Sequence, residues 1–225
     1  MDMRVAVVGG GSWGTTVAHL TAHNAPTVLY TRREDVAAAV NEQHMNPRYL
    51  AGYALHDDLS ASTDLAAVVS EADVLVMGVP SSGFRQTLVE VRPHLRPLIP
   101  VVSLAKGFEI GSRKRMTQLV AEELPGHPVG VLTGPNLAKE ILRGSAAAAV
   151  LAFVDLAIAE RLQDVVSSDL FRVYSSTDVV GCELGGALKN VIALAAGMAD
   201  GLGTGDNTRA AVMTRGLAEV TRLGV

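Results

Sequence analysis

Two lysines stand at positions where an ammonium group could do chemistry. Lys189 lies inside the stretch GALKNVIALAAG, whose apolar residues repeat at helical spacing, and Asn190 follows it. Lys189 is about 100° round the helix from Leu188, so its side chain is expected at the edge of the apolar face. An ammonium there can donate a proton to a substrate oxygen. Asn190 can hold a substrate hydroxyl, or it can simply face water on the wet side of the helix.

The neighbours of Lys189 predict how its helix is placed. Leu184, Leu188 and Val191 recur at helical spacing and are expected to face the core. The glycine pair at 185–186 would let the helix backbone approach a neighbouring layer closely. Glu183 is interpreted as a solvated or helix-end charge, with an ion pair in the neighbourhood of Lys189 as the alternative.

The second lysine, Lys106, follows an apolar run at 99–104 and precedes a glycine. Two further runs end in polar or unusual residues, VPSS at 79–82 and TGPN at 133–136, and Asn136 is a plausible N-cap for the next helix. Ligands of open parallel sheets bind outside the carboxyl ends of the strands, so a lysine there could hold an anion. The alternative for Lys106 is an exposed surface lysine, which is the usual fate of this residue type.

A glycine-rich turn near the N-terminus predicts a dinucleotide site. The strand-like run VAVV at 5–8 leads directly into GGGSWG at 9–14, and helical spacing follows. In this G-x-G-x-x-G pattern Gly9 would form the tight turn, Gly11 would let a pyrophosphate approach the backbone, and Gly14 would let helix and strand pack closely. Free N–H groups at the helix start would bind the phosphates. Trp13 could contact the cofactor or pack in the fold.

The next strand-like run ends in Arg32 and Arg33. A site selective for NAD usually has an acidic residue there to accept the ribose hydroxyls. Guanidinium groups suit the 2′-phosphate of NADP instead, so the sequence favours NADP without excluding NAD. The alternative is a solvated basic loop with Glu34 and Asp35 as its neighbours.

The elements that would position these residues alternate along the chain. Strand-like runs lie at 4–8, 27–31, 74–79, 99–104, 130–133, 147–152 and 171–174, and helical patterns lie at 15–23, 34–43, 84–91, 114–123 and 156–166. This alternation predicts an α/β fold with a Rossmann-type doubly wound, mostly parallel sheet. After Asp178 only helical spacing remains. We therefore expect a dinucleotide-binding domain at 1–178 and the start of a second, helical domain at 179–225.

Composition restricts the function classes. The net charge is −4 and basic residues are scattered, so no nucleic-acid partner is expected. The six histidines show no paired spacing with carboxylates or with Cys182, so no metal site is indicated. A lone cysteine fits a reducing compartment. The longest apolar run is shorter than the roughly 20 residues that span a bilayer, so a cytoplasmic protein without membrane insertion is expected.

Several blocks resemble the bacterial NAD(P)-dependent glycerol-3-phosphate dehydrogenase family. They occur in the family's order and are GGGSWGT at 9–15, NPRYL at 46–50, VPS at 79–81, SLAKGFE at 103–109, GPNLAKE at 134–140 and DVVGCELGGALKNVIALAAGMADGLGTGDNTRAAVMTRGLAE at 178–219. The resemblance implies reversible, NAD(P)H-dependent reduction of dihydroxyacetone phosphate to sn-glycerol 3-phosphate, which supplies phospholipid synthesis. A phosphorylated triose would be the small-molecule partner, and a homodimer is one open oligomeric state.

The resemblance also implies roles for individual residues. Lys189 would be the general acid/base and would touch the substrate. Lys106 would contact both cofactor and substrate. The other implied cofactor contacts are Ser12, Trp13, Arg32, Arg33 and Ala138, and the other implied substrate contacts are Gly134 and Asn136. Most members of the family carry serine where this chain has Asn136.

The chain departs from the family most clearly in length, because members continue for roughly another hundred residues by the same resemblance. By this resemblance, 179–225 would be an incomplete helical substrate domain. This chain is expected to lack the family's C-terminal third, which holds an arginine for the substrate phosphate and an aspartate that assists the lysine. Two functions therefore stay open, an active dehydrogenase and a nucleotide-binding remnant with little or no turnover. A related reductase of the ketopantoate type is disfavoured by SLAKGFE and GALKNVIALAAG.

Overall fold

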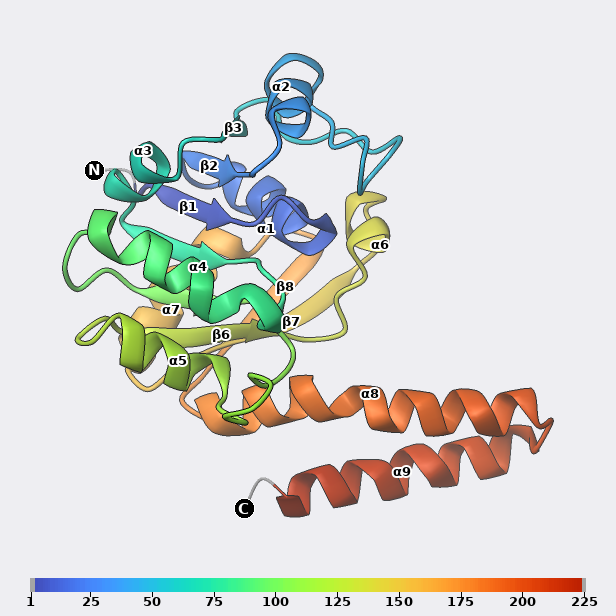
Figure 1. Cartoon of the computed structure of the whole chain (residues 1–225). Coiled ribbons are helices and arrows are strands. Elements are labelled where there is room, and N and C mark those ends of the chain that lie inside the picture. The colour runs from blue at the N-terminus through green and yellow to red at the C-terminus, as the bar shows by residue number, and fades with distance from the viewer. Residues whose placement is uncertain (1–2, 224–225) are drawn as a thin grey trace.

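The computed structural model describes residues 3–223, so residues 1–2 and 224–225 of the two expected domains lie outside it. One eight-stranded sheet runs through the fold in the order β3-β2-β1-β4-β5-β6-β7-β8. All neighbouring strands are parallel except the β6–β7 pair, so β7 and β8 run opposite to the other six. Helices cover both faces of the sheet, and two long helices follow it (Figure 1). The predicted α/β class with a Rossmann-type, mostly parallel sheet is confirmed.

The elements have the following bounds. The strands are β1 Val5–Val8, β2 Thr27–Tyr30, β3 Ser60–Ser62, β4 Val74–Met77, β5 Val101–Ser103, β6 Val129–Thr133, β7 Ala147–Phe153 and β8 Phe171–Ser176. The helices are α1 Ser12–Ala22, α2 Glu34–Gln43, α3 Leu65–Ser70, α4 Phe84–Val91, α5 Met116–Glu123, α6 Ala138–Leu142, α7 Leu156–Val166, α8 Val179–Gly201 and α9 Gly205–Leu223, with short 3₁₀ turns at Ser81–Gly83 and Arg92–His94.

The seven expected strands all form, and three expected helices, α2, α4 and α7, have the bounds that their spacing predicts. The sequence did not reveal β3, α3 and α6. Each is short, with three, six and five residues, so neither a period of 2 nor a period of 3.6 can develop. Helix α1 begins at Ser12, three residues before the expected start, because it uses the last residues of the glycine turn as its first turn.

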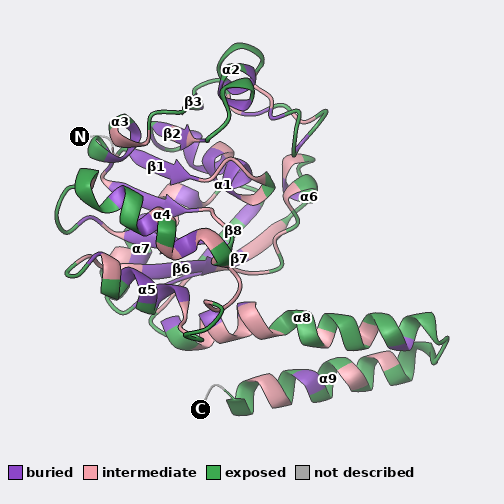
Figure 2. Cartoon of the chain, viewed as in Figure 1, coloured by how far each residue is buried: buried purple, intermediate pink, exposed green. Residues whose placement is uncertain are grey.

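Side chains of the central strands alternate between two apolar layers. Val5 and Val7 of β1 join a cluster with residues of α1, α2 and α7, whereas Ala6 and Val8 join a second cluster with residues of α3, α4 and α5. Strands buried on both faces read as continuous apolar runs, which is why their positions were visible in the sequence. The buried residues of Figure 2 gather in this sheet domain.

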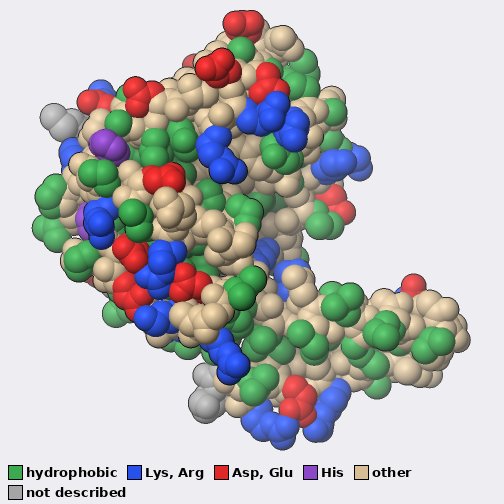
Figure 3. Space-filling model, in the orientation of Figure 1, with side chains coloured by type: hydrophobic (Ala, Val, Ile, Leu, Met, Phe, Trp, Pro, Cys, Tyr) green, Lys and Arg blue, Asp and Glu red, His purple; other side chains and the backbone are tan. Residues whose placement is uncertain are grey.

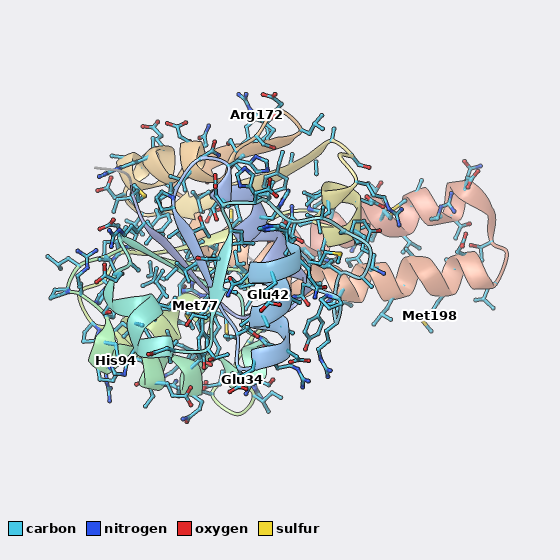
Figure 4. The ribbon with its side chains drawn as sticks, turned by 90° about the horizontal axis from the view of Figure 1, so that it is seen from above. Glu34, Glu42, Met77, His94, Arg172 and Met198 are labelled. Carbon is cyan, nitrogen blue, oxygen red and sulfur yellow. The ribbon has the colours of Figure 1, made fainter. Side chains whose placement is uncertain are left out.

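Helices α8 and α9 form an antiparallel pair that projects from the sheet domain (Figure 1). Helix α8 starts against the sheet, where Val179 packs with Val131 and Ala152. Beyond that start most of the pair is exposed (Figure 2). Seen from above in Figure 4, Met198 lies on the projecting pair and Glu34 on the sheet domain. Within residues 3–223, Val191 is 62% exposed, so the expectation that its side chain faces the core is wrong.

The exposed length of α8 is apolar for a helix in water. By length and composition alone α8 could cross a membrane, since its most apolar window has a mean hydropathy of 1.5 and only 11% of that window is buried. Such a helix is weak evidence for a membrane span, and the first turns of α8 are packed on the sheet. Helix α9 covers another side of α8, where Gly216 lies against Ile192.

Candidate active site

The glycine turn joins β1 to α1 through very close backbone packing. Gly9 has a φ of 125°, a conformation that side-chain-bearing residues rarely adopt. A Cβ on Gly9 would lie 2.6 Å from the carbonyl oxygen of Gly78, and a Cβ on Gly14 would clash with the carbonyl oxygen of Gly9. The start of α1 is therefore pressed against the ends of β1 and β4, as the glycine pattern predicts.

The N-terminus of α1 is open to an anion. Gly11 is the N-cap and has no side chain to bond the first turn, and a Cβ built on it would meet nothing within 4 Å. The N–H groups of Ser12, Trp13 and Gly14 have no acceptor within the helix because of their place in its first turn. Free N–H groups and the positive end of the helix dipole together suit a phosphate. These residues fit the pyrophosphate of a dinucleotide.

Trp13 packs inward from this turn. Its ring lies 6.3 Å from the ring of Phe171, between centroids, and contacts the apolar cluster on that face of the sheet. Its Nε1–H is buried without a hydrogen-bond partner among the described residues. This contact accounts for the packing of the ring, and a cofactor contact of Trp13 stays a prediction.

The two arginines after β2 have different surroundings. Arg33 donates two hydrogen bonds to Asp35, from Nε to Oδ1 and from Nη2 to Oδ2, each 2.9 Å long. This pairing raises the pKa of Arg33 and lowers the pKa of Asp35. Arg32 is exposed, and its guanidinium has no hydrogen bond or ion pair to any residue in the range 3–223. Arg32 is thus the arginine whose guanidinium is available for a ligand.

Lys106 lies at the carboxyl end of β5 and reaches the end of β6. Its Nζ donates a hydrogen bond of 2.8 Å to the carbonyl oxygen of Gly134. Burial lowers the pKa of Lys106, and the positive charge of Lys189 lowers it further. Lys106 is thus a half-buried cation at the carboxyl ends of β5 and β6 rather than a free surface lysine.

Helix α8 brings Lys189 to the same edge. A Cβ on Gly186 would lie 2.8 Å from Thr133 Oγ1 and 3.7 Å from Lys106 Cγ, so the helix backbone touches the end of β6. Lys189 follows one turn later; it is exposed, and its Nζ donates a hydrogen bond of 3.0 Å to Asn190 Oδ1. Figure 3 shows Lys and Arg side chains in the recess between the sheet domain and the helix pair. Two ammonium groups there can attract a phosphate and a carbonyl oxygen.

Asn136 and its neighbours complete the edge. The Asn136 Nδ2 donates a long hydrogen bond of 3.4 Å to the carbonyl oxygen of Ala148, and its Oδ1 is buried with no partner among the described residues. The expected N-cap role is wrong, because α6 begins at Ala138 and its N-cap is Leu137. Gly134 lies against the strand β7, since a Cβ on it would be 2.7 Å from the Ala148 carbonyl oxygen.

Glu183 has a structural role that the sequence did not reveal. Its carboxylate is buried, contrary to the solvated charge expected, and accepts a hydrogen bond of 2.9 Å from the backbone N–H of Thr117. The Thr117 hydroxyl donates to the same carboxylate, and Arg115 forms an ion pair with it. Glu183 therefore fixes the first turns of α8 to the N-terminus of α5. Its partners are 66 and 68 residues away, a separation at which no local pattern could show the contact.

The chain is similar to known proteins along its whole length. The family model described as the N-terminus of NAD-dependent glycerol-3-phosphate dehydrogenase matches residues 4–159, and the model of the C-terminus of the same family matches residues 178–225. The glycerol-3-phosphate dehydrogenase [NAD(P)+] 2 of Sphingopyxis alaskensis is 58% identical over all of this chain, which covers 68% of that protein.

Two further similar proteins carry the same enzyme name. Glycerol-3-phosphate dehydrogenase [NAD(P)+] 1 of Mycobacterium tuberculosis is 53% identical over all of this chain, which covers 66% of that protein. The crystal structure of glycerol-3-phosphate dehydrogenase from Coxiella burnetii superposes with a TM-score of 0.90 at 34% identity, over 99% of this chain and 68% of that one. The chain thus spans about two thirds of the length of the relatives that it matches.

Proposed function

Since the chain belongs to the NAD-dependent glycerol-3-phosphate dehydrogenase family, we propose that it reduces dihydroxyacetone phosphate to sn-glycerol 3-phosphate with NADH or NADPH, reversibly. The product would supply glycerophospholipid synthesis. The cofactor is NAD or NADP, as in the names of the relatives, and the class of enzyme is oxidoreductase.

The observation that carries this proposal is that Lys106 and Lys189 lie close together at the carboxyl ends of β5 and β6. The two ammonium groups are close enough for the charge of Lys189 to affect the pKa of Lys106. The carboxyl end of β5, where Lys106 lies, is two strands along the sheet from the end of β1, where the glycine turn begins. A phosphorylated ketone between the lysines would therefore lie beside a bound dinucleotide.

The chain's own residues would hold the cofactor from two places. The N–H groups at the start of α1 would bind the pyrophosphate, and Arg32 would contact the ribose end, including a 2′-phosphate. Contacts of Ser12, Trp13 and Ala138 with the nucleotide are part of the same proposal. Arg33 would contribute less because Asp35 already occupies its guanidinium. When bound, the reduced nicotinamide supplies the hydride that the ketone carbon accepts.

Lys189 would complete the reaction at the substrate oxygen. The carbonyl oxygen gains negative charge as its carbon is reduced, and an ammonium that donates a proton to it stabilises this charge. Lys106 would hold the substrate by a hydrogen bond and by its charge. The other proposed substrate contacts are Gly134, Asn136 and Asn190. The net change is one ketone, one NAD(P)H and one proton converted to one alcohol and one NAD(P)+.

A direct test is the oxidation of NADPH by the purified chain with dihydroxyacetone phosphate. The proposal predicts loss of NADPH absorbance that depends on the substrate, and near-complete loss of this rate in the Lys189→Ala variant with nucleotide binding retained. Near-normal kcat in Lys189→Ala would contradict the assignment of the proton donor. Nucleotide binding without any oxidation would favour the second candidate, a binding remnant with little or no turnover.

Three coarser expectations are proposals as well. The dinucleotide-binding domain would occupy 1–178 and the helical substrate domain 179–225, a division that limited proteolysis tests. We propose a cytoplasmic location without membrane insertion, which fractionation of cells tests. A homodimer stays a prediction that light scattering of the purified protein would test.

A further inference from the structure

A side chain from outside the glycine turn holds that turn on both sides. Asn46 is fully buried in the segment that follows α2. Its Nδ2 donates one hydrogen bond of 3.0 Å to the carbonyl oxygen of Gly10 and another of 2.9 Å to Thr15 Oγ1. Gly10 lies in the turn, and Thr15 lies in the first turn of α1. Asn46 therefore bridges the two residues that flank the free N–H groups of Ser12, Trp13 and Gly14.

The orientation of this amide is fixed by its partners. The Gly10 carbonyl can only accept a hydrogen bond, so the NH₂ group and not the oxygen of Asn46 must face it. Both amide protons are then used within the glycine turn and α1. The Asn46 Oδ1 is left buried without a partner among the residues that the structure describes. The Asn46 side chain thus forms both of its donor hydrogen bonds although its oxygen stays unpaired. We take these two donor bonds as the reason for its position.

The turn needs such support because its own side chains cannot supply it. Three successive glycines precede α1, and glycine gives the backbone more conformational freedom than any other residue. A phosphate site made of backbone N–H groups works best when those groups already point at the ligand. The bonds from Asn46 to Gly10 and Thr15 limit the movement of the turn before any ligand arrives.

Asn46 is itself held by its own segment. Its carbonyl oxygen accepts hydrogen bonds from the backbone N–H of Leu50, at 2.8 Å, and of Tyr49, at 3.3 Å. Leu50 is fully buried and so anchors this short turn in the core. The amide of Asn46 thus extends from a fixed backbone rather than from a loose loop.

We propose that Asn46 is a positioning residue of the cofactor site, which shapes the phosphate-binding turn without touching the nucleotide. This role rests on the proposed use of NAD or NADP. Because the pyrophosphate is common to both cofactors, loss of the Asn46 amide weakens the binding of NADH and of NADPH by the same factor. This distinguishes Asn46 from Arg32, whose loss affects NADPH more.

The test is a binding titration, which needs no turnover. Trp13 is the single tryptophan of the chain and lies in the turn, so quenching of its fluorescence reports nucleotide binding. For Asn46→Ala we expect the Kd of NADH and of NADPH to rise about tenfold each, the scale of one to two lost hydrogen bonds. The maximum quenching at saturation should be retained.

Asn24→Ala is the matched control. The Asn24 Nδ2 also donates two hydrogen bonds, to the carbonyl oxygens of Val165 and Ser167, but it lies past the other end of α1. Its loss should leave both Kd values within about twofold, although it removes as many hydrogen bonds. Equal effects of the two substitutions, or an Asn46→Ala Kd within twofold of the unsubstituted protein, would overturn the proposal.

A second pair of variants decides the question if Asn46→Ala does not fold. Thr15→Val keeps the shape of a buried side chain but removes the acceptor of one Asn46 bond, and Thr15→Ser restores a hydroxyl. Weaker binding in Thr15→Val that Thr15→Ser recovers supports the role of Asn46, and no difference between the two contradicts it. If the unsubstituted chain binds neither nucleotide, the proposed function fails, and the role of Asn46 fails with it.

Discussion

The position that a Cβ would take on Gly186 lies 2.8 Å from the hydroxyl oxygen of Thr133, so this glycine is where α8 meets the end of β6. We predict that Gly186→Ala lowers the free energy of unfolding by about 1–3 kcal/mol, because the added methyl group forces the helix and the strand apart. Urea denaturation measures this change. Any movement of α8 would also shift Lys189 relative to Lys106, and reduction of the substrate should slow accordingly.

The adjacent glycine provides the control for this prediction. A Cβ on Gly185 meets nothing within 4 Å, and alanine favours a helix over glycine by about 1 kcal/mol. Gly185→Ala should therefore leave stability unchanged or raise it slightly. Equal stabilities of the two alanine variants would show that the contact between Gly186 and Thr133 does not limit how closely α8 approaches.

Loss of the Glu183 carboxylate should loosen the attachment of α8 to α5. Glu183→Ala leaves the Thr117 N–H and hydroxyl and the Arg115 guanidinium without their acceptor, so we expect a loss of about 2–4 kcal/mol in the free energy of unfolding. Glu219, which forms exposed ion pairs with Arg215 and Arg222 on α9, is the control and should cost less than about 1 kcal/mol. A loss for Glu183→Ala no larger than for Glu219→Ala would contradict the buried contact.

The two arginines after β2 should differ in their effect on cofactor choice. Arg32→Ala is expected to weaken NADPH roughly tenfold or more relative to NADH, since a guanidinium bound to a phosphate makes strong, charge-assisted hydrogen bonds. Arg33→Ala should change the ratio less, because Asp35 already holds that side chain. Fluorescence titration with both nucleotides gives the two ratios. Equal losses of NADH and NADPH in Arg32→Ala would remove the assignment to the 2′-phosphate.

The stability of the fold should fall in weak acid because of a histidine cluster outside the site. The rings of His19, His23 and His56 lie together, and the His56 backbone N–H donates a hydrogen bond of 2.9 Å to His19 Nδ1. Burial, and then the charges of the other two rings, lower the pKa of His19 from 6.5 to about 4. The unfolded chain thus binds a proton that the folded chain rejects between these values.

The sign follows from that difference. The contribution of His19 is fully present above about pH 6.5 and is lost as the pH falls towards 4. Its size is on the order of 1–2 kcal/mol, since the ring is partly exposed and solvent screens the charges. Urea denaturation at pH 7 and pH 5 measures the loss. His19→Gln keeps an acceptor for the His56 N–H without a titrating ring, and it should reduce the dependence on pH; an unchanged dependence would exclude His19 as its source.

The fold was accessible from the sequence where structure is local. The apolar runs of β1 and β4 are buried on both faces, and the glycine turn between β1 and α1 has a fixed spacing, so each could be predicted from a few neighbouring residues. The strand β3 could not, because its three residues carry two serines and depend on pairing with β2.

The side chains that support the candidate site were hidden for a different reason. Asn46 contacts residues 31 and 36 positions before it, and Glu183 contacts residues 66 and 68 positions before it. Only the folded chain brings these partners together. Isolated polar residues of this kind, Glu183 among them, look like surface residues in a sequence.

Because β7 and β8 run in the reversed direction, the length of the first part of α8 sets the position of Lys189. Strand β8 ends at the edge of the sheet opposite to the glycine turn, so α8 must cross the sheet alongside β6 before Lys189 can emerge beyond Thr133. Each residue of a helix advances the chain by about 1.5 Å and turns it by about 100°. Insertion or deletion of a single residue between Val179 and Gly186 would therefore turn the ammonium of Lys189 away from Lys106, even if every other side chain were kept.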